Sequence, residues 1–261
     1  MQMTGNAVLI TGGATGIGFA LARKLVEGGN DVVICGRRRD RIESALSLVP
    51  GLRGLACDLA RDDDITRLLD FTWKACGRLD VLINNAAVQI QADAVEGALG
   101  FAVIEEEIRI NLLAPMKLTM AALPVLLAQP AALIANLCSL LAIMPKPNAP
   151  GYCASKAGLY GFSQALRLRL QGTSVRVAAV FPPLVATPMT EGRGHNKMLA
   201  DAFAVAMLRQ LESNREEVRV GQAAIILALH RLYPPLAGWW TRRISKGVTQ
   251  PDRGARPEMV Q

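Results

Sequence analysis

Short apolar runs alternate with longer segments of helical periodicity along most of the chain. The first run reads AVLI at 7–10, and similar runs occupy 31–35, 54–57 and 79–83. Apolar positions in the segments that follow them recur every three or four residues, as in an amphipathic helix. Mostly apolar runs are typical of strands buried on both faces of a parallel sheet. The pattern predicts parallel strand–helix–strand units with right-handed crossovers.

The second half of the chain continues this alternation. Two further apolar runs, 132–138 and 174–181, are predicted strands, and a long helix is predicted from about Pro150 to Leu170. The prediction is an α/β fold: a Rossmann-like, doubly wound parallel sheet of six strands, a seventh being doubtful, with helices on both faces.

Another long helix is predicted between the fourth and fifth strands. We expect Glu105, Glu106 and Glu107 near its start and Leu127 near its end. Pro115 lies inside this helix, and because proline lacks a backbone N–H, a local break that frees backbone groups is expected there.

Length and composition indicate one domain covering residues 1–261. Hydrophobic residues make up 51% and charged residues 20% of the chain, a composition that excludes disorder. Residues 188–214 contain glycines and then a helical pattern, so we expect them to form a lid over the substrate. Residues 231–261 form an atypical C-terminal segment.

Several classes of site and location are not expected. The five cysteines lack CxxC spacing and there are only two histidines, so we predict no disulfide framework and no metal site. The net charge is +7, but the arginines are scattered, and nucleic-acid binding is not favoured. No signal peptide or run of eighteen apolar residues is seen, which predicts a cytoplasmic protein.

The C-terminal segment has two readings. Trp239 and Trp240 lie among basic residues, a composition that suits a membrane surface or another subunit. Because the segment is short and is interrupted by Pro234 and Pro235, we favour a subunit or intramolecular contact over a membrane contact.

A glycine-rich turn follows the first predicted strand. In TGGATGIG, residues 11–18, the glycines at 12, 16 and 18 permit a tight turn and close backbone approach. A pyrophosphate can then sit on the N-terminus of the next helix, where free N–H groups favour an anion. This context favours a dinucleotide site over a purely structural turn.

The end of the second predicted strand distinguishes the two nicotinamide cofactors. An acidic residue there would bind the ribose 2′-OH of NAD, but this chain has Gly36 followed by Arg37 and Arg38. Arginine suits a 2′-phosphate, so NADP (NADPH) is favoured over NAD. We interpret Arg39 and Arg41 as residues of a solvated helix start.

Tyr152 and Lys156 are the main candidate for chemistry. They lie four residues apart in a predicted helix, so their side chains share one face. An ammonium beside a phenol lowers the phenol pKa toward the range of an acid/base catalyst. Ser139, at the end of the fifth predicted strand, could hold a substrate oxygen, and the NNAA turn at 84–87 should lie under the cofactor.

Together these motifs resemble the short-chain dehydrogenase/reductase family over Val8 to about Gln222. The matching elements are TGGATGIG, Asp58, NNAA, Asn111, Ser139, YCASK at 152–156 and a proline motif at 182–187. The resemblance implies that Tyr152 is the general acid or base and that Lys156 lowers its pKa and binds the nicotinamide ribose. It also implies that Ser139 holds the substrate oxygen and that Asn111 supports a water-linked proton relay. The cofactor-binding residues it implies are Gly12, Thr15, Gly16, Ile17, Gly18, Arg37, Arg38, Asp58, Leu59, Asn85, Ala86, Tyr152, Lys156, Pro182, Val185 and Thr187.

The chain departs from the usual family pattern in three places. Ala87 replaces the glycine of NNAG, Pro183 replaces the glycine after the sixth strand, and the C-terminal segment is atypical. These features resemble the DltE-like branch of the family. We expect an NADP-dependent oxidoreductase that interconverts a carbonyl and an alcohol, with an apolar small-molecule substrate, as a homodimer or homotetramer. The alternatives are a cofactor-assisted isomerase or cyclase and a catalytically silent regulatory protein.

Overall fold

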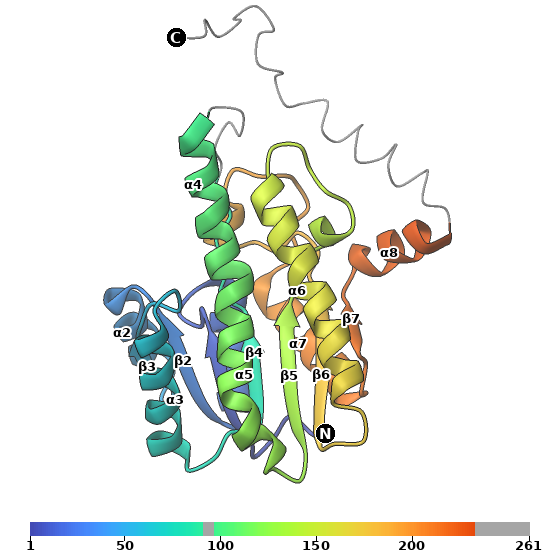
Figure 1. Cartoon of the computed structure of the whole chain (residues 1–261). Helices are drawn as coiled ribbons and strands as arrows, with labels where there is room; N and C mark the ends of the chain where they lie inside the picture. The colour runs from blue at the N-terminus through green and yellow to red at the C-terminus, as the bar shows by residue number, and fades with distance from the viewer. Residues whose placement is uncertain (91–96, 233–261) are drawn as a thin grey trace, which may run out of the picture.

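Seven parallel strands form one sheet at the centre of the molecule (Figure 1). The computed structural model describes residues 1–90 and 97–232. The strand order is β3-β2-β1-β4-β5-β6-β7, so the direction of winding reverses between β1 and β4. The strands are β1 (Ala7–Thr11), β2 (Asp31–Gly36), β3 (Arg53–Ala56), β4 (Val81–Asn84), β5 (Ala132–Leu137), β6 (Val175–Phe181) and β7 (Glu217–Arg219). Ligands of such sheets bind at the carboxyl ends of the strands near this reversal.

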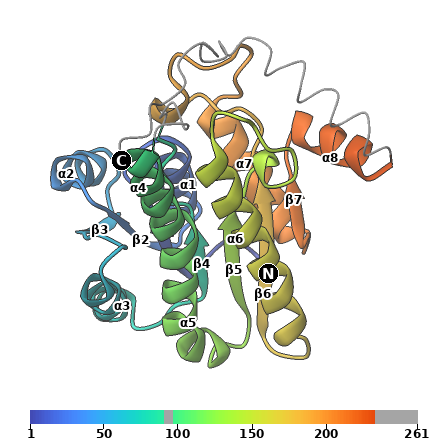
Figure 2. The ribbon, with the colours of Figure 1, turned by 45° about the horizontal axis from the view of Figure 1, so that its top comes forward.

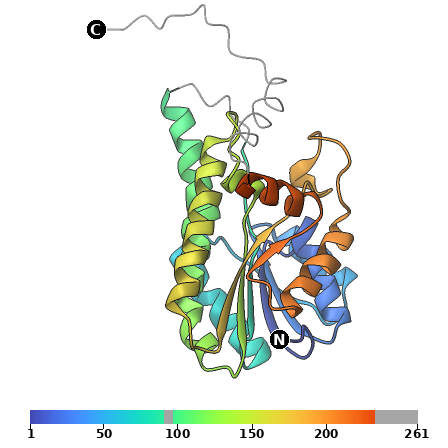
Figure 3. The same ribbon diagram turned by 90° about the vertical axis from the view of Figure 1, so that its right-hand side faces the viewer.

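Helices cover both faces of the sheet, as the side view in Figure 3 shows. α1, α2 and α7 pack on one face, and α3, α5 and α6 pack on the other. The helices are α1 (Gly16–Glu27), α2 (Arg39–Leu48), α3 (Asp62–Cys76), α4 (Gly97–Ile108), α5 (Ala114–Leu127), α6 (Pro150–Arg169), α7 (Ala200–Glu212) and α8 (Gln222–Leu232). The doubly wound architecture expected from the sequence is confirmed.

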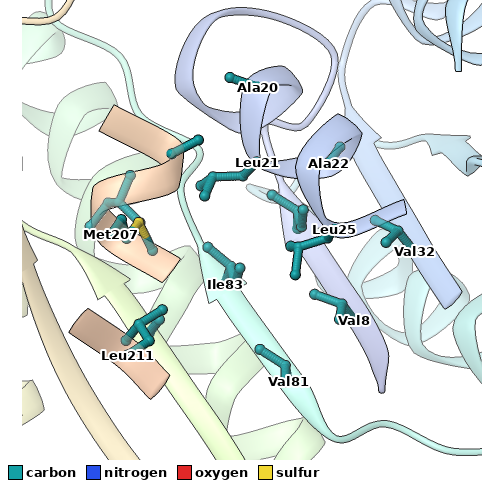
Figure 4. Close-up of a cluster of buried hydrophobic side chains, with 14 of the residues drawn as sticks. Val8, Ala20, Leu21, Ala22, Leu25, Val32, Val81, Ile83, Met207 and Leu211 are labelled. Carbon is teal, nitrogen blue, oxygen red and sulfur yellow. The ribbon is translucent and has the colours of Figure 1, made fainter. Parts of the chain in front are cut away.

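Alternate residues of the central strands point to opposite faces of the sheet. Val8 and Ile10 of β1 belong to the core beside α1, whereas Leu9 between them belongs to the core beside α3 and α5. Figure 4 shows Val8 with Leu21 and Leu25 of α1 in the first of these cores. Burial on both faces explains why the strand sequences contain uninterrupted apolar residues.

The seventh strand is present, although the sequence left it doubtful. β7 is three residues long and pairs in parallel with β6, with Val218 opposite Val180. Val218 is fully buried, but Glu217 and Arg219 on either side of it are only partly buried. A three-residue edge strand with two charged residues has no apolar run, which is why the pattern did not reveal it.

The long helix before β5 differs from expectation at its start. α4 already includes Gly97, so Glu105–Glu107 lie in its final turns and the expectation that they stand near the start is wrong. The expected local break is confirmed: residues Arg109–Leu113 form a π-helical segment, and Pro115 lies in the first turn of α5.

The continuous helical stretch Gly100–Leu127 is long and apolar enough to cross a membrane by length and composition alone. In the fold, however, Leu118, Ala122 and Leu126 of this stretch are buried against the sheet. A core helix passes the same test of length and composition, and these contacts identify the stretch as a helix of the core.

Only part of the expected lid is free of the core. The region 188–214 includes α7, whose residues Phe203, Met207 and Leu211 are fully buried on the α1 side of the sheet. Because α7 fills the core, it cannot also move as a lid, and only the loop at 188–199 could do so. The aromatic and basic residues noted in the C-terminal segment from residue 233 onward lie outside the described residues.

Candidate active site

The glycine turn between β1 and α1 is built by close backbone contacts. A Cβ at Gly12 would lie 2.9 Å from the Cα of Ala86, and a Cβ at Gly18 would lie 2.2 Å from the carbonyl oxygen of Gly12. Gly12 and Gly16 also have positive φ angles, 64° and 55°. The sequence TGGATGIG therefore folds this way because a side chain at these positions would clash or be strained.

The N-terminus of α1 has the properties of an anion site. Its N-cap residue, Thr15, makes no side-chain capping hydrogen bond, and no acidic residue lies in the first turn. The first backbone N–H groups of a helix have no partner within the helix, and its dipole favours negative charge there. The turn therefore offers N–H donors and no competing carboxylate.

The turn after β4 is tied to the glycine turn by Thr11 and Asn85. The Thr11 hydroxyl accepts hydrogen bonds from the backbone N–H groups of Asn85 and Ala86, each at 3.0 Å. The Asn85 side chain donates to the carbonyl oxygens of Thr11 and Gly12, at 2.8 and 3.0 Å. Thr11 was not among the predicted site residues. Its position at the end of β1, as the first residue of the motif TGGATGIG, could have identified it as one.

A cavity of about 370 Å³ opens at the carboxyl ends of the strands beside these two turns. Figure 2 turns this edge of the molecule toward the viewer. Most predicted site residues line the cavity: Gly12, Thr15, Gly16, Ile17, Arg37, Arg38, Asp58, Leu59, Asn85, Ala86, Tyr152, Lys156, Pro182 and Thr187. The structure thus brings together residues from six separate segments of the chain.

Four predicted residues do not line the cavity. Gly18 lies beneath the glycine turn, Asn111 is fully buried, and Val185 is buried in the core, bridged to Met198. Ser139 is also absent from the wall, but its hydroxyl lies near enough to the phenol of Tyr152 to lower the pKa of that phenol. Wall residues that were not predicted as site residues include Ala14, Cys57, Val88, Ile110, Leu137, Cys138 and Met189.

Three arginines stand at one end of the cavity. Arg37, Arg38 and Arg41 all line it, and Arg41 is also exposed at the start of α2, as a solvated helix start requires. Arg41 lies in the first turn of α2, which brings its side chain back toward the end of β2. Arg37 lies 3.4 Å from a carboxylate oxygen of Glu106 and is half exposed.

Tyr152, Lys156 and Ser139 meet at the other end. Tyr152 and Lys156 lie in the first two turns of α6, and the ammonium nitrogen of Lys156 is 5.8 Å from the Tyr152 ring centroid. That nitrogen donates a hydrogen bond to the carbonyl oxygen of Leu137, at 2.8 Å, and Lys156 is only 2% exposed. Ser139 ends β5, and its hydroxyl accepts a hydrogen bond from the N–H of Leu141 at 3.1 Å.

The pKa of Tyr152 departs from expectation. Burial raises the pKa of the Tyr152 phenol to about 12, although its hydrogen bond with Ser139 acts in the opposite direction. Burial also lowers the pKa of Lys156 to about 8. The predicted lowering of the tyrosine pKa by the lysine is therefore not seen: the groups that shift this pKa do not include Lys156, whose ammonium is directed to Leu137.

Asn111 acts as a structural connection. It lies in the π-helical segment, and its side chain bonds both the N–H and the carbonyl of Val88, each at 2.8 Å. The same side chain donates to the Ser155 hydroxyl at 3.2 Å. Asn111 thereby joins the turn after β4 to α6. Within the described residues, no group of three or more His, Cys, Asp or Glu side chains could hold a metal ion.

The cavity fits a dinucleotide. It combines a glycine turn with no room for side chains, an uncapped helix N-terminus, and three arginines that follow β2, the strand next to β1. Its volume lies within the range of small-molecule and cofactor sites. The fold and site together define a nucleotide-binding α/β enzyme of Rossmann type.

The short chain dehydrogenase family matches residues 6–198, and the chain belongs to this family. It is 37% identical over 224 residues to an uncharacterised oxidoreductase, DltE of Bacillus subtilis, covering 84% of this chain and 89% of DltE. This similarity places the chain in the DltE-like branch. The chain is accordingly an NAD(P)-dependent oxidoreductase of the short-chain dehydrogenase family.

Two solved structures share the fold. A short chain dehydrogenase from Burkholderia cenocepacia, in complex with NADP, aligns with a TM-score of 0.83 and 23% identity, covering 92% of this chain and 99% of that one. A 3-ketoacyl-(acyl-carrier-protein) reductase from Brucella melitensis, complexed with NADH, aligns with a TM-score of 0.72 and 24% identity, covering 78% and 90%.

Proposed function

We propose that this protein uses NADPH to reduce a ketone or aldehyde to an alcohol, with Tyr152 as the general acid. The observation that carries this proposal is the presence of Tyr152, Lys156 and the glycine turn on the wall of one cavity. The Ser139 hydroxyl lies beside the phenol at the same place. A proton donor and a nicotinamide site are the two parts that carbonyl reduction requires.

The bound cofactor supplies hydride to the carbonyl carbon. The chain's own residues handle the proton and the oxygen. Ser139 holds the substrate oxygen beside Tyr152, and the Tyr152 phenol donates its proton to that oxygen. Lys156 holds ribose hydroxyls of the cofactor. The turns at Gly12 and Asn85 fix the backbone against which the dinucleotide lies.

The pKa of Tyr152 suits a general acid for carbonyl reduction at neutral pH. With a pKa of about 12, the phenol keeps its proton at pH 7 and is ready to act as an acid. Alcohol oxidation needs the phenolate, so its rate should increase as the pH is raised.

A preference for NADPH over NADH is part of the proposal. Arg37, Arg38 and Arg41 can bind a 2′-phosphate, and Gly36 stands where NAD-preferring sites carry an acidic residue. Arg37→Ala should weaken NADPH binding about tenfold or more while changing NADH binding little. Fluorescence titration with both cofactors measures this. Arg39→Ala, which removes a neighbouring charge outside the cavity wall, is the control; equal losses for NADPH and NADH in Arg37→Ala would contradict the preference.

We expect an apolar substrate. The wall near Tyr152 contains Val88, Ile110, Cys138 and Met189, which offer mainly apolar surface. A panel of apolar ketones and aldehydes, followed by NADPH absorbance, is therefore the first screen. A cofactor-assisted isomerase or cyclase would convert its substrate without net loss of NADPH, and a silent regulatory protein would bind NADPH and convert nothing.

Tyr152→Phe tests the mechanism. The change removes only the phenolic oxygen, so turnover should fall by about a thousandfold or more while NADPH binding is retained. Turnover is followed by NADPH absorbance and binding by fluorescence. Tyr160→Phe, on the same helix but bonded to Glu217, is the matched control. A Tyr152→Phe variant with wild-type turnover would refute the proposed role.

A further inference from the structure

Glu107 is a buried carboxylate that the proposed mechanism does not use. It lies near the end of α4 and is 2% exposed. None of the described lysines and arginines forms an ion pair with it. An unpaired buried carboxylate is costly to maintain, so its hydrogen-bond partners show what it does.

Two backbone N–H groups from different segments of the chain lie close to this carboxylate. Glu107 accepts a hydrogen bond from the N–H of Ile90 at 2.9 Å, in the segment after β4. The backbone N–H of Tyr152, at the start of α6, lies near enough to lower the pKa of Glu107. A Cβ at Gly151 would lie 2.5 Å from a carboxylate oxygen of Glu107, so glycine at 151 is what allows this close approach.

The start of α6 needs such an acceptor. Its N-cap residue, Ala149, has no side chain that can cap, and Pro150 follows at the first helical position. The N–H of Tyr152 would otherwise be one of the unsatisfied donors of a helix N-terminus. The carboxylate of Glu107, from α4, lies against this uncapped start of the catalytic helix, with its negative charge favourably placed at the positive end of the helix dipole.

Glu107 and Asn111 repeat the same arrangement one helical turn apart. Asn111 joins Val88 to Ser155 of α6, and Glu107 bonds the N–H of Ile90 and lies against Gly151 at the start of α6. Residues four apart on a helix lie on the same face, so the two side chains make neighbouring contacts between the same two segments. Both connect the segment after β4 to the first turns of α6.

We propose that Glu107 is a positioning residue for catalysis: its carboxylate holds the backbone of Tyr152 in place and directs the phenol toward the substrate oxygen. The inference rests on the proposed function of Tyr152. Misplacement of a catalytic group by about 1 Å can cost on the order of a hundredfold in rate. Loss of the contact between the Glu107 carboxylate and the start of α6 should therefore lower kcat more than it changes the Kd for the cofactor.

Glu107→Gln tests the proposal, because it keeps the shape and one acceptor oxygen but removes the charge. We expect kcat to fall about tenfold, and up to about a hundredfold in Glu107→Ala, with the Kd for NADPH within about twofold of wild type. Glu105→Gln is the matched control, since Glu105 is exposed on the same helix and pairs with Arg109. Wild-type kcat in both Glu107 variants would overturn the proposal.

A pH profile separates positioning from a purely structural role. The titratable groups around Tyr152 are Glu107 from α4, Cys138 after β5, and Cys153 and Lys156 on α6. Removing the negative charge of Glu107 favours the phenolate, so the fall in carbonyl reduction at high pH should begin at lower pH in Glu107→Gln. An unchanged pH profile would argue that Glu107 only stabilises the fold.

Hydrogen–deuterium exchange gives a readout that does not need activity. The Tyr152 amide, in a peptide covering residues 150–155, should exchange about tenfold faster in Glu107→Ala than in wild type or Glu105→Gln. Unchanged exchange would overturn the proposed contact. If wild type shows no turnover on any carbonyl, the proposed function fails, and the exchange experiment still decides whether Glu107 holds Tyr152.

Discussion

At the scale of single residues, Lys156 is a site residue whose buried charge lowers the free energy of unfolding. Its side chain is almost fully buried and has one hydrogen-bond partner among the described residues, the Leu137 carbonyl. Burial lowers its pKa from 10.5 to about 8, which corresponds to a cost of about 3 kcal/mol for keeping the charged form folded. A core position occupied by a lysine is best explained by its role in the site.

Lys156→Met should stabilise the fold at pH 7 while removing activity. Methionine fills a similar volume without charge, and loss of the bond to Leu137 costs about 1 kcal/mol, so we expect a net gain of about 2 kcal/mol. The free-energy cost of burying charged Lys156 is fully present below pH 8 and disappears by pH 10.5. Between these pH values the side chain is protonated only in the unfolded chain, so the free energy of unfolding rises with pH. The gain should therefore shrink between pH 7 and pH 9.5.

Urea unfolding at the two pH values measures this effect. Lys117→Met is the control, since Lys117 is half exposed and pairs with Asp62 at the surface. A Lys156→Met variant less stable than wild type by the same amount at both pH values would show that burial of the charge is not the dominant cost.

At the scale of elements, α5 carries two different apolar faces. Ala114, Leu118 and Ala122 face the sheet and are buried. A second stripe, formed by Leu113 of the preceding π-helical segment with Met120 and Leu127 of α5, is 43%, 53% and 41% exposed. These three residues are seven apart, so they lie along one side of the helix. Because α5 and α6 lie side by side on one face of the molecule (Figures 1 and 2), this stripe suits contact with a second copy of the chain.

We propose that the protein is a homodimer through this surface, and Met120→Glu tests it. A charge at the centre of an apolar interface is costly to bury, so the assembly should dissociate to the 28 kDa chain. Light scattering after size exclusion measures the mass. Leu48→Glu, at an exposed leucine on α2, is the control. The same dimer mass in both variants would locate the interface elsewhere.

At the scale of the whole molecule, local patterns in the sequence determined most of the architecture. Buried strands need uninterrupted apolar runs, amphipathic helices need a three-to-four residue period, and the turn at Gly12 and Gly18 has no room for a side chain. The i, i+4 spacing likewise placed Tyr152 and Lys156 on one helical face. These features were predictable because each depends on residues close together in the chain.

Only the tertiary structure decided the features that depend on distant segments. Glu107 and Tyr152 lie on different helices, and no local period relates them. Arg41 reaches the cavity because α2 turns back beside β2, and β7 forms because β6 offers a free edge for Val218. The pKa of Tyr152 is raised because folding buries the phenol, whereas the sequence shows only the neighbouring lysine. Sequence determined which groups are available; packing decided which of them meet and how strongly water is excluded from them.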